Sequence, residues 1–171
     1  MTNVNRHIKH SYDSVLMNIA SGVTVNMGDL MFLNNTSNLL NNGSSSADYY
    51  AYPLENLRAS GASISVNKTY VKSRFLGVAL DDVDGINDNE VKKISVATSG
   101  KFLFDLKPAK TISEGDMFSP SGTTTASDMF NQKISKTDDS AIAIGYFAER
   151  KLHALSAYVI LKTAFSNTGI I

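Results

Sequence analysis

The chain has 171 residues, with sixteen basic and sixteen acidic side chains, so its formal net charge is zero. This length suits one domain with room for an added arm or insertion. The absence of cysteine excludes a disulfide framework and a thiolate metal site. A neutral chain also lacks the basic surplus that is typical of nucleic-acid-binding proteins. Hydrophobic residues make up 43% and charged residues only 19%, so we expect a folded core and a surface of mostly uncharged polar groups.

The first residues are polar and contain no apolar segment of the kind found in secretory signal peptides. No apolar run approaches the ~20 residues that a membrane-spanning helix needs. We therefore expect a protein made in a cytoplasm, with no membrane partner. Residues 1–13 show no hydrophobic periodicity and are predicted to form an extended N-terminal arm, followed by a β-rich domain over residues 14–171.

The first part of the domain shows strand patterns. Apolar residues alternate with polar ones over residues 23–27, which predicts a half-buried strand. A turn at Gly28 and Asp29 leads into a second predicted strand over residues 30–33. Residues 34–48 are rich in Asn, Ser and Gly and are predicted to form a long loop.

Three tyrosines follow this loop. Tyr49, Tyr50 and Tyr52 form a dense aromatic segment that has two interpretations. The tyrosines either pack in the core or form an exposed contact patch, because tyrosine is enriched at protein interfaces.

The remainder of the chain is predicted to contain mostly short strands. Ser63 is a suitable N-cap for a short helix over residues 63–73, although the same segment also fits a strand. Strands are predicted over residues 75–80, 91–97, 102–106, 141–147 and 156–162, with a strand end at Pro108 and a Ser/Thr/Gly loop over residues 119–127. Short strands separated by turns indicate a mainly β protein built as a small barrel or a sandwich.

One pattern occurs twice. In each instance a strand enters a Gly-Asp pair, an apolar strand leaves it, and a later strand contains a central glycine. The two instances begin near residues 25 and 112, and chance reuse of turns is the alternative explanation. Glycine lets strands bend or cross closely, and Asp caps a turn. The glycines with this predicted structural role are Gly28, Gly77, Gly115 and Gly145.

The sequence contains no recognisable catalytic or metal-binding pattern. His7, His10 and His153 are scattered, which is a poor basis for a zinc site. No Gly-x-Ser-x-Gly or phosphate-loop motif is present. Residues 82–90 are acidic but lack the spacing of a calcium-binding loop, so we interpret them as a solvated hairpin tip. We expect no catalytic residues, no metal and no cofactor.

Several short motifs nevertheless occur in a recognisable order. The order runs through Phe-Leu-Gly-Val-Ala-Leu-Asp-Asp at residues 75–82, Ile-Ser-Val-Ala-Thr-Ser-Gly-Lys-Phe at 94–102, and Glu-Gly-Asp-Met-Phe at 114–118. A second glycine-containing strand at residues 144–148 and a closing strand at 157–162 follow. This order resembles the capsid-cement, or head-decoration, proteins of tailed bacteriophages.

The resemblance implies a β-tulip-like domain that assembles as a homotrimer on the exterior of a mature capsid and is not an enzyme. Its partners would be the major capsid protein and other copies of itself, and its role would be to stabilise the lattice by binding only the assembled state. An extended arm can add a strand to a neighbouring sheet. The candidate arm contacts are Thr2, Asn3, Val4, Asn5, Arg6, His7 and Ile8.

Two other functions remain open at this stage. The chain could be another virion β-module, such as a head-fibre base or tail component, with Tyr49, Tyr50 and Tyr52 as a host-glycan contact. The weaker alternative is a β-clip enzyme domain, because no acid/base pair is visible in the sequence.

Overall fold

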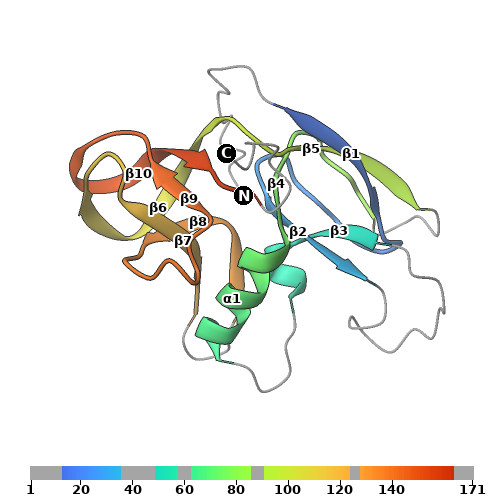
Figure 1. The fold of residues 1–171 in the computed structure, drawn as a ribbon. Coiled ribbons are helices and arrows are strands. Elements are labelled where there is room, and N and C mark those ends of the chain that lie inside the picture. The colour runs from blue at the N-terminus through green and yellow to red at the C-terminus, as the bar shows by residue number, and fades with distance from the viewer. Residues whose placement is uncertain (1–12, 36–48, 58–62, 86–90, 124–127, 164–171) are drawn as a thin grey trace, which may run out of the picture.

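The computed structural model describes residues 13–35, 49–57, 63–85, 91–123 and 128–163. In these residues the strands close into two barrels that lie side by side (Figure 1). The prediction of a mainly β protein with small-barrel architecture and a short helix is confirmed, but the division into two barrels was not predicted. The β-tulip-like arrangement and the extended arm remain predictions.

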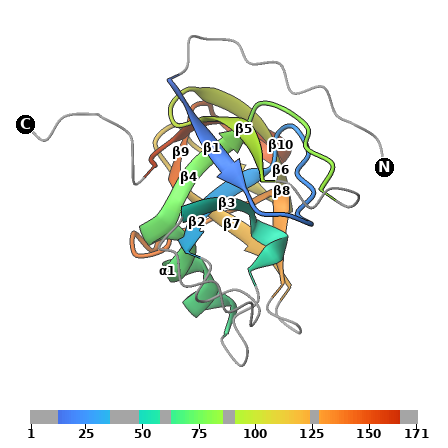
Figure 2. The ribbon, with the colours of Figure 1, turned by 90° about the vertical axis from the view of Figure 1, so that its right-hand side faces the viewer.

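The first barrel, called barrel I, is built from the N-terminal strands. Its strands are β1 (Ser14–Ile19), β2 (Leu30–Asn35), β3 (Tyr49–Pro53), β4 (Phe75–Ala79) and β5 (Lys92–Ala97). They are arranged around the barrel in the order β1-β3-β2-β4-β5. The contact between β1 and β3 is parallel, and the other four contacts are antiparallel. Figure 2 shows this barrel in front.

The second barrel, barrel II, repeats this topology. Its strands are β6 (Lys101–Ile112), β7 (Met117–Gly122), β8 (Met129–Lys136), β9 (Gly145–Phe147) and β10 (Lys151–Leu161). Their order around the barrel is β6-β8-β7-β9-β10, and the contact between β6 and β8 is again the parallel one. Each strand of barrel II therefore has a counterpart in barrel I at the same place in the chain order. The molecule is an internal duplication.

The repeated sequence pattern lies at equivalent places in the two barrels. The backbone N–H of Gly28 donates to the carbonyl of Ala79 at 2.9 Å, and Gly115 donates to Phe147 at the same distance. Both glycines have a positive φ, +91° and +84°, a conformation that glycine adopts without steric cost. The two Gly-Asp turns thus join equivalent strands in the same way.

The two strand glycines also share a role. Gly77 lies in β4 and Gly145 in β9, rather than in turns. A Cβ atom at Gly77 would lie 1.8 Å from the carbonyl oxygen of Ala97, and one at Gly145 would lie 2.2 Å from that of Ile160. Glycine is therefore required where each barrel brings its fourth and fifth strands close together.

A helix spans the junction of the two barrels. Helix α1 (Ile64–Arg74) begins after Ser63, whose hydroxyl oxygen accepts a hydrogen bond from the backbone of Val66. This confirms the predicted short helix and its cap. The helix contacts β2 of barrel I and β7 of barrel II (Figure 1). A single 3-10 turn, η2 (Leu54–Asn56), packs beside β8.

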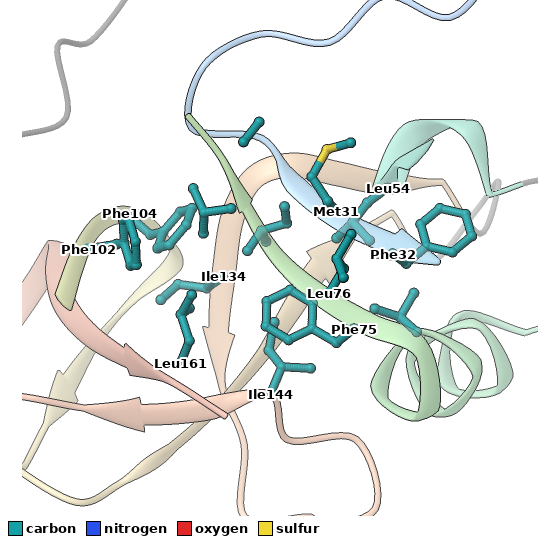
Figure 3. Packing of buried hydrophobic residues seen from close by; sticks show 14 of the residues in the cluster. Met31, Phe32, Leu54, Phe75, Leu76, Phe102, Phe104, Ile134, Ile144 and Leu161 are labelled. Atoms are coloured by element: carbon teal, nitrogen blue, oxygen red, sulfur yellow. The ribbon is translucent and has the colours of Figure 1, made fainter. Parts of the chain in front are cut away.

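The hydrophobic core is continuous through both barrels. Figure 3 shows Met31 and Leu76 of barrel I and Ile134 and Phe104 of barrel II within one cluster of buried side chains. All five residues of β4 are buried. This strand therefore has apolar neighbours on both faces, unlike a half-buried strand.

Several predicted boundaries differ from the structure. The strand predicted over residues 141–147 is β9, which begins only at Gly145 because a turn precedes it, and the strand predicted over 156–162 is β10, which begins at Lys151. Residues 23–27 form no strand, and Val25 makes only an isolated bridge to Val83 because turns on both sides limit the pairing. Strand β6 continues past Pro108, since the ladder between β6 and β10 is interrupted between Asp105 and Lys110 and requires no donor from the proline. Part of the predicted loop at 119–127 belongs to β7.

Strand β8 was not predicted at all. It contains only two well-buried apolar side chains, Met129 and Ile134, and between them lie the half-buried Phe130 and three polar residues, without regular alternation. Such a sequence lacks the period-2 signal. Its strand conformation comes from pairing with β7 and β6.

Candidate functional site

The predicted arm contacts lie outside the described residues, which begin at Asp13. Asp13 itself is anchored to barrel I. Its carbonyl accepts a hydrogen bond from the backbone of Thr98 at 2.8 Å, and its backbone N–H donates to the hydroxyl of Ser99 at 2.9 Å. Asp13 therefore belongs with the barrel, although the sequence placed it at the end of the arm.

The three tyrosines do not form one exposed patch. Tyr49 is 57% exposed, Tyr50 is half-buried, and Tyr52 is only 5% exposed. The Tyr52 ring packs 6.0 Å from that of Phe32, and burial raises its pKa. The exposed-patch interpretation is wrong for Tyr52, because β3 turns this side chain into the core. Only Tyr49 remains available as an exposed contact.

The duplicated Gly-Asp turns place two aspartates in equivalent positions. In each turn the Asp carboxylate accepts a hydrogen bond from the backbone N–H of the residue three positions earlier. Asp29 accepts from Asn26 at 2.9 Å, and Asp116 accepts from Ser113 at 2.7 Å. This is the turn-capping role predicted from the sequence.

Beyond the turn, Asp29 ties the two barrels together. It is buried, with 1% of its surface exposed. The side-chain amide of Gln132 on β8 donates to Asp29 Oδ1 at 2.9 Å, and that of Asn131 is 3.4 Å from Oδ2. Asn131 also accepts a hydrogen bond from the backbone of Glu55 at 2.7 Å. The junction is therefore a polar network built around a carboxylate of barrel I and two amides of barrel II.

Sequence reasoning missed this junction. Asn131 and Gln132 lie on the unpredicted strand β8 and belong to no motif. The Gly28–Asp29 pattern identified the turn but not its partner, because the partner is more than a hundred positions away in the chain. The only available signal was the repeat itself, which marked Asp29 as equivalent to Asp116.

Asp116 has a different environment. Its carboxylate forms an ion pair with Lys136 Nζ at 2.5 Å, and both side chains are partly exposed. The hydrogen bond from Lys136, together with that from Ser113, lowers the pKa of Asp116. Burial instead raises the pKa of Asp29, and the hydrogen bonds from Asn26 and Gln132 only partly oppose this. The surroundings of this turn thus lower the pKa of the carboxyl group in barrel II and raise the pKa of its equivalent in barrel I.

Replacing these two carboxylates by amides is expected to change the pH dependence of stability in opposite directions. The pKa of Asp116 is lower in the folded protein, so its stabilising contribution is present above the ordinary value of 3.8 and is lost as the pH falls through the folded value. The pKa of Asp29 is higher in the folded protein, so its contribution is present below 3.8 and is lost as the pH rises through the folded value.

Relative to the wild type, Asp116→Asn should therefore lower the free energy of unfolding more at about pH 6 than at about pH 3. Asp29→Asn should lower it less at about pH 6 than at about pH 3. Urea unfolding of both variants and the wild type across this range measures the effect. If the free energy of unfolding changed with pH in the same way in both variants, this would contradict the different environments of the two turns.

The predicted acidic hairpin tip is only partly described. Asp82 Oδ1 accepts a hydrogen bond from the backbone of Met27 at 2.7 Å, so it stabilises the neighbouring turn. Residues 86–90 lie outside the described part. Among the described residues, no group of three or more His, Asp or Glu side chains is placed to hold a metal ion. The described helix is too short and too polar to cross a membrane.

The exposed side of helix α1 forms a shallow open groove. Val66, Tyr70 and Arg74 follow each other along it at helical spacing, as the sequence indicated. The Arg74 guanidinium lies 4.0 Å from the centre of the Tyr70 ring, and the Tyr70 hydroxyl donates to Asn34 Oδ1 at 2.8 Å. The guanidinium group of Arg74 and the hydroxyl group of Tyr70 thus both interact with other groups of the same chain.

Comparison with known proteins gives structural likenesses alone. No family model matches the chain, and no curated protein matches it. A solved structure, the head fibre gp8.5 N base in bacteriophage phi29, is similar with a TM-score of 0.43 and 13% sequence identity. The match covers 87% of this chain and 94% of that chain. At this level the likeness assigns no function to the chain.

Proposed function

We propose that the chain is a structural protein of a tailed-bacteriophage virion, which binds the exterior of the mature head as a decoration protein and has no enzymatic activity. The observation that carries the proposal is the ordered set of motifs between residues 75 and 118, which resembles head-decoration proteins. These motifs occupy the consecutive strands β4, β5 and β6 and the start of β7, where the chain passes from barrel I to barrel II. They therefore lie on the strands of the framework and on the turns that join these strands.

The proposed partners are the major capsid protein and other copies of this chain in a trimer. A protein that binds only the assembled lattice stabilises that lattice by mass action. Trimerisation would add the contacts of three copies at one lattice position. The arm residues before Asp13 are proposed to reach neighbouring subunits. The anchoring of Asp13 to Thr98 and Ser99 gives such an arm a fixed starting point on barrel I.

Quantitative mass spectrometry of purified mature heads tests this role. A decoration protein should be present in on the order of hundreds of copies per head, because icosahedral symmetry repeats its binding site. A handful of copies would favour the alternative, a head-fibre base or tail component. Absence from purified virions would contradict both functions. The glycan-binding form of the alternative has lost support, since Tyr52 is buried and Tyr49 alone of the three tyrosines is more than half exposed.

A deletion tests the arm separately. Removing residues 1–12 leaves Asp13 and its hydrogen bonds in place. The shortened protein should keep the melting temperature of the full chain but bind purified heads more weakly. Equal binding by the two proteins would show that the arm makes no contact with the head.

A further inference from the structure

The two barrels share one topology but differ in the lengths of two strands. Strands β6 and β10 of barrel II continue well beyond the lengths of their counterparts β1 and β5. We call this extension the ribbon and define it as residues 107–112 of β6 and 151–155 of β10. The two strands of the ribbon pair through Ile112 with Lys151 and Lys110 with Ala154. In barrel I the same place holds only the isolated bridge between Val25 and Val83, so a continuous ribbon is not required to form a barrel.

The equivalent part of barrel I contains buried apolar side chains. Val25 bridges to Val83 in the way that Ile112 pairs with Lys151, and Val23 occupies the place of Lys110. Val23, Val25 and Val83 are all buried. In barrel II, by contrast, residues 107–111 of β6 are exposed. Lys110 is thus exposed in barrel II at the place where Val23 is buried in barrel I, whereas Ile112 is buried like Val25.

The ribbon also exposes large apolar side chains. Leu152 is 70% exposed and Leu155 is 73% exposed, the two highest values for large hydrophobic residues in the described part of the chain. Exposing two leucines on one short segment is unfavourable unless a partner covers them. Elsewhere on β10 the side chains of Ala157 and Val159 are buried and Ile160 is 50% exposed, so the two most exposed side chains of the strand's large apolar residues lie in the ribbon.

The backbone between these leucines is strained. His153 has φ +47°, and it is the one residue other than glycine with a positive φ in the described ranges. A non-glycine residue in this conformation raises the energy of the fold and tends to persist where it presents side chains for a function. The register of β10 shifts on both sides of Ala154, the neighbour of His153. The strand is thereby distorted at the place where the leucines project.

The charge of the ribbon indicates the kind of partner. Its two segments contain Lys107, Lys110 and Lys151 and no carboxylate. Lys151 is paired with Glu149 at 2.8 Å, and Lys107 lies 4.7 Å from the ring of Phe130. The positive charge of Lys107 and Lys110 therefore has no acidic counterpart within the ribbon. A complementary surface would carry carboxylates around an apolar recess.

We propose that the ribbon is the docking surface of barrel II for an acidic protein surface with an apolar recess, into which Leu152 and Leu155 insert. On the proposed function, on which this inference rests, that surface is part of the mature head. The leucines would act as the buried anchors of the interface, and the lysines would surround them at its rim.

The test compares two double variants of the full chain in binding to purified mature heads. Leu152→Ser with Leu155→Ser should weaken the binding about 10-fold or more, because truncating anchor residues removes most of the affinity of an interface. Leu16→Ser with Val66→Ser is the matched control, since these side chains are also more than half exposed but lie outside the ribbon. Both variants should melt close to the wild type, as exposed positions rarely affect stability.

A third variant tests the rim. Lys107→Glu with Lys110→Glu should also weaken binding, and the loss should shrink at high salt because screening removes the repulsion. Equal loss at all salt concentrations would contradict an acidic partner.

The outcomes separate the two proposals. If the wild type binds heads and the leucine variant binds equally well, the docking surface is wrong and the decoration function stands. If the wild type does not bind heads, the decoration function fails and the docking proposal fails with it. Sedimentation velocity of the chain alone, and flotation with phosphatidylserine vesicles, complete the test. Leucine-dependent self-association or vesicle binding would assign the ribbon to a different occupant and overturn the proposal.

Discussion

Replacing Gly77 by alanine is expected to destabilise the protein by more than about 3 kcal/mol, because the added Cβ would overlap a backbone carbonyl. The Cβ atom would lie 1.8 Å from the carbonyl oxygen of Ala97 and 3.3 Å from the Cα of Thr98. Neither is the end of a flexible side chain, so relief requires β4 and β5 to separate. The φ of Gly77, +148°, adds strain for any residue with a Cβ.

Thermal unfolding measures this effect. A loss of this size lowers the melting temperature of a domain of this length by about 6–12 °C. Gly115→Ala is the matched control, since Gly115 also has a positive φ but its Cβ would meet nothing within 4 Å. Its cost should stay at about 1–2 kcal/mol, the price of the left-handed conformation alone. Similar melting temperatures for the two variants would show that β4 and β5 are not as close as the structure places them.

Replacing Asp29 by alanine should be the most damaging change at the barrel junction, at about 2–3 kcal/mol. The change removes the acceptor of the Asn26 backbone N–H and of the Gln132 amide, and both donors would be left near a buried site. Unsatisfied buried donors carry a desolvation cost of about 1–3 kcal/mol each. Relief of the buried negative charge offsets part of this loss.

Asp116→Ala is the internal comparison, because it removes the same turn bond from the second barrel. Asp116 lies at the surface, so water can replace the lost contacts with Ser113 and Lys136. We expect a cost of about 1 kcal/mol or less. Urea unfolding of both variants at neutral pH gives the two values. A larger effect at Asp116 would contradict the role of Asp29 as the link between the barrels.

The parts of the fold that the sequence predicted are those with local signals. Ser63 marked the start of α1, and the Gly-Asp pairs marked two turns, because caps and turns depend on residues close together in the chain. The buried run at β4 was equally clear. The repeated pattern in the sequence identified equivalent turns and equivalent strand glycines, but it did not predict that the chain forms two barrels.

The parts that were missed depend on distant contacts. Strand β8 has polar side chains because Asn131 and Gln132 face the junction with barrel I, so its hydrophobic pattern is irregular. Tyr52 is indistinguishable from its exposed neighbour Tyr49 in sequence, and only the packing against Phe32 decides its position. The exposure of Leu152 and Leu155 is similarly invisible, because isolated leucines in a strand are normally buried.

The continuous core has a consequence for how the molecule unfolds. Two barrels with the same topology could in principle melt one after the other, as independent units do. Here, however, loss of either barrel would expose apolar side chains of the other, since Leu76 and Ile134 belong to one cluster and α1 contacts both halves. The duplicated halves are thus thermodynamically coupled into a single cooperative unit, although each retains the strand order of a complete barrel.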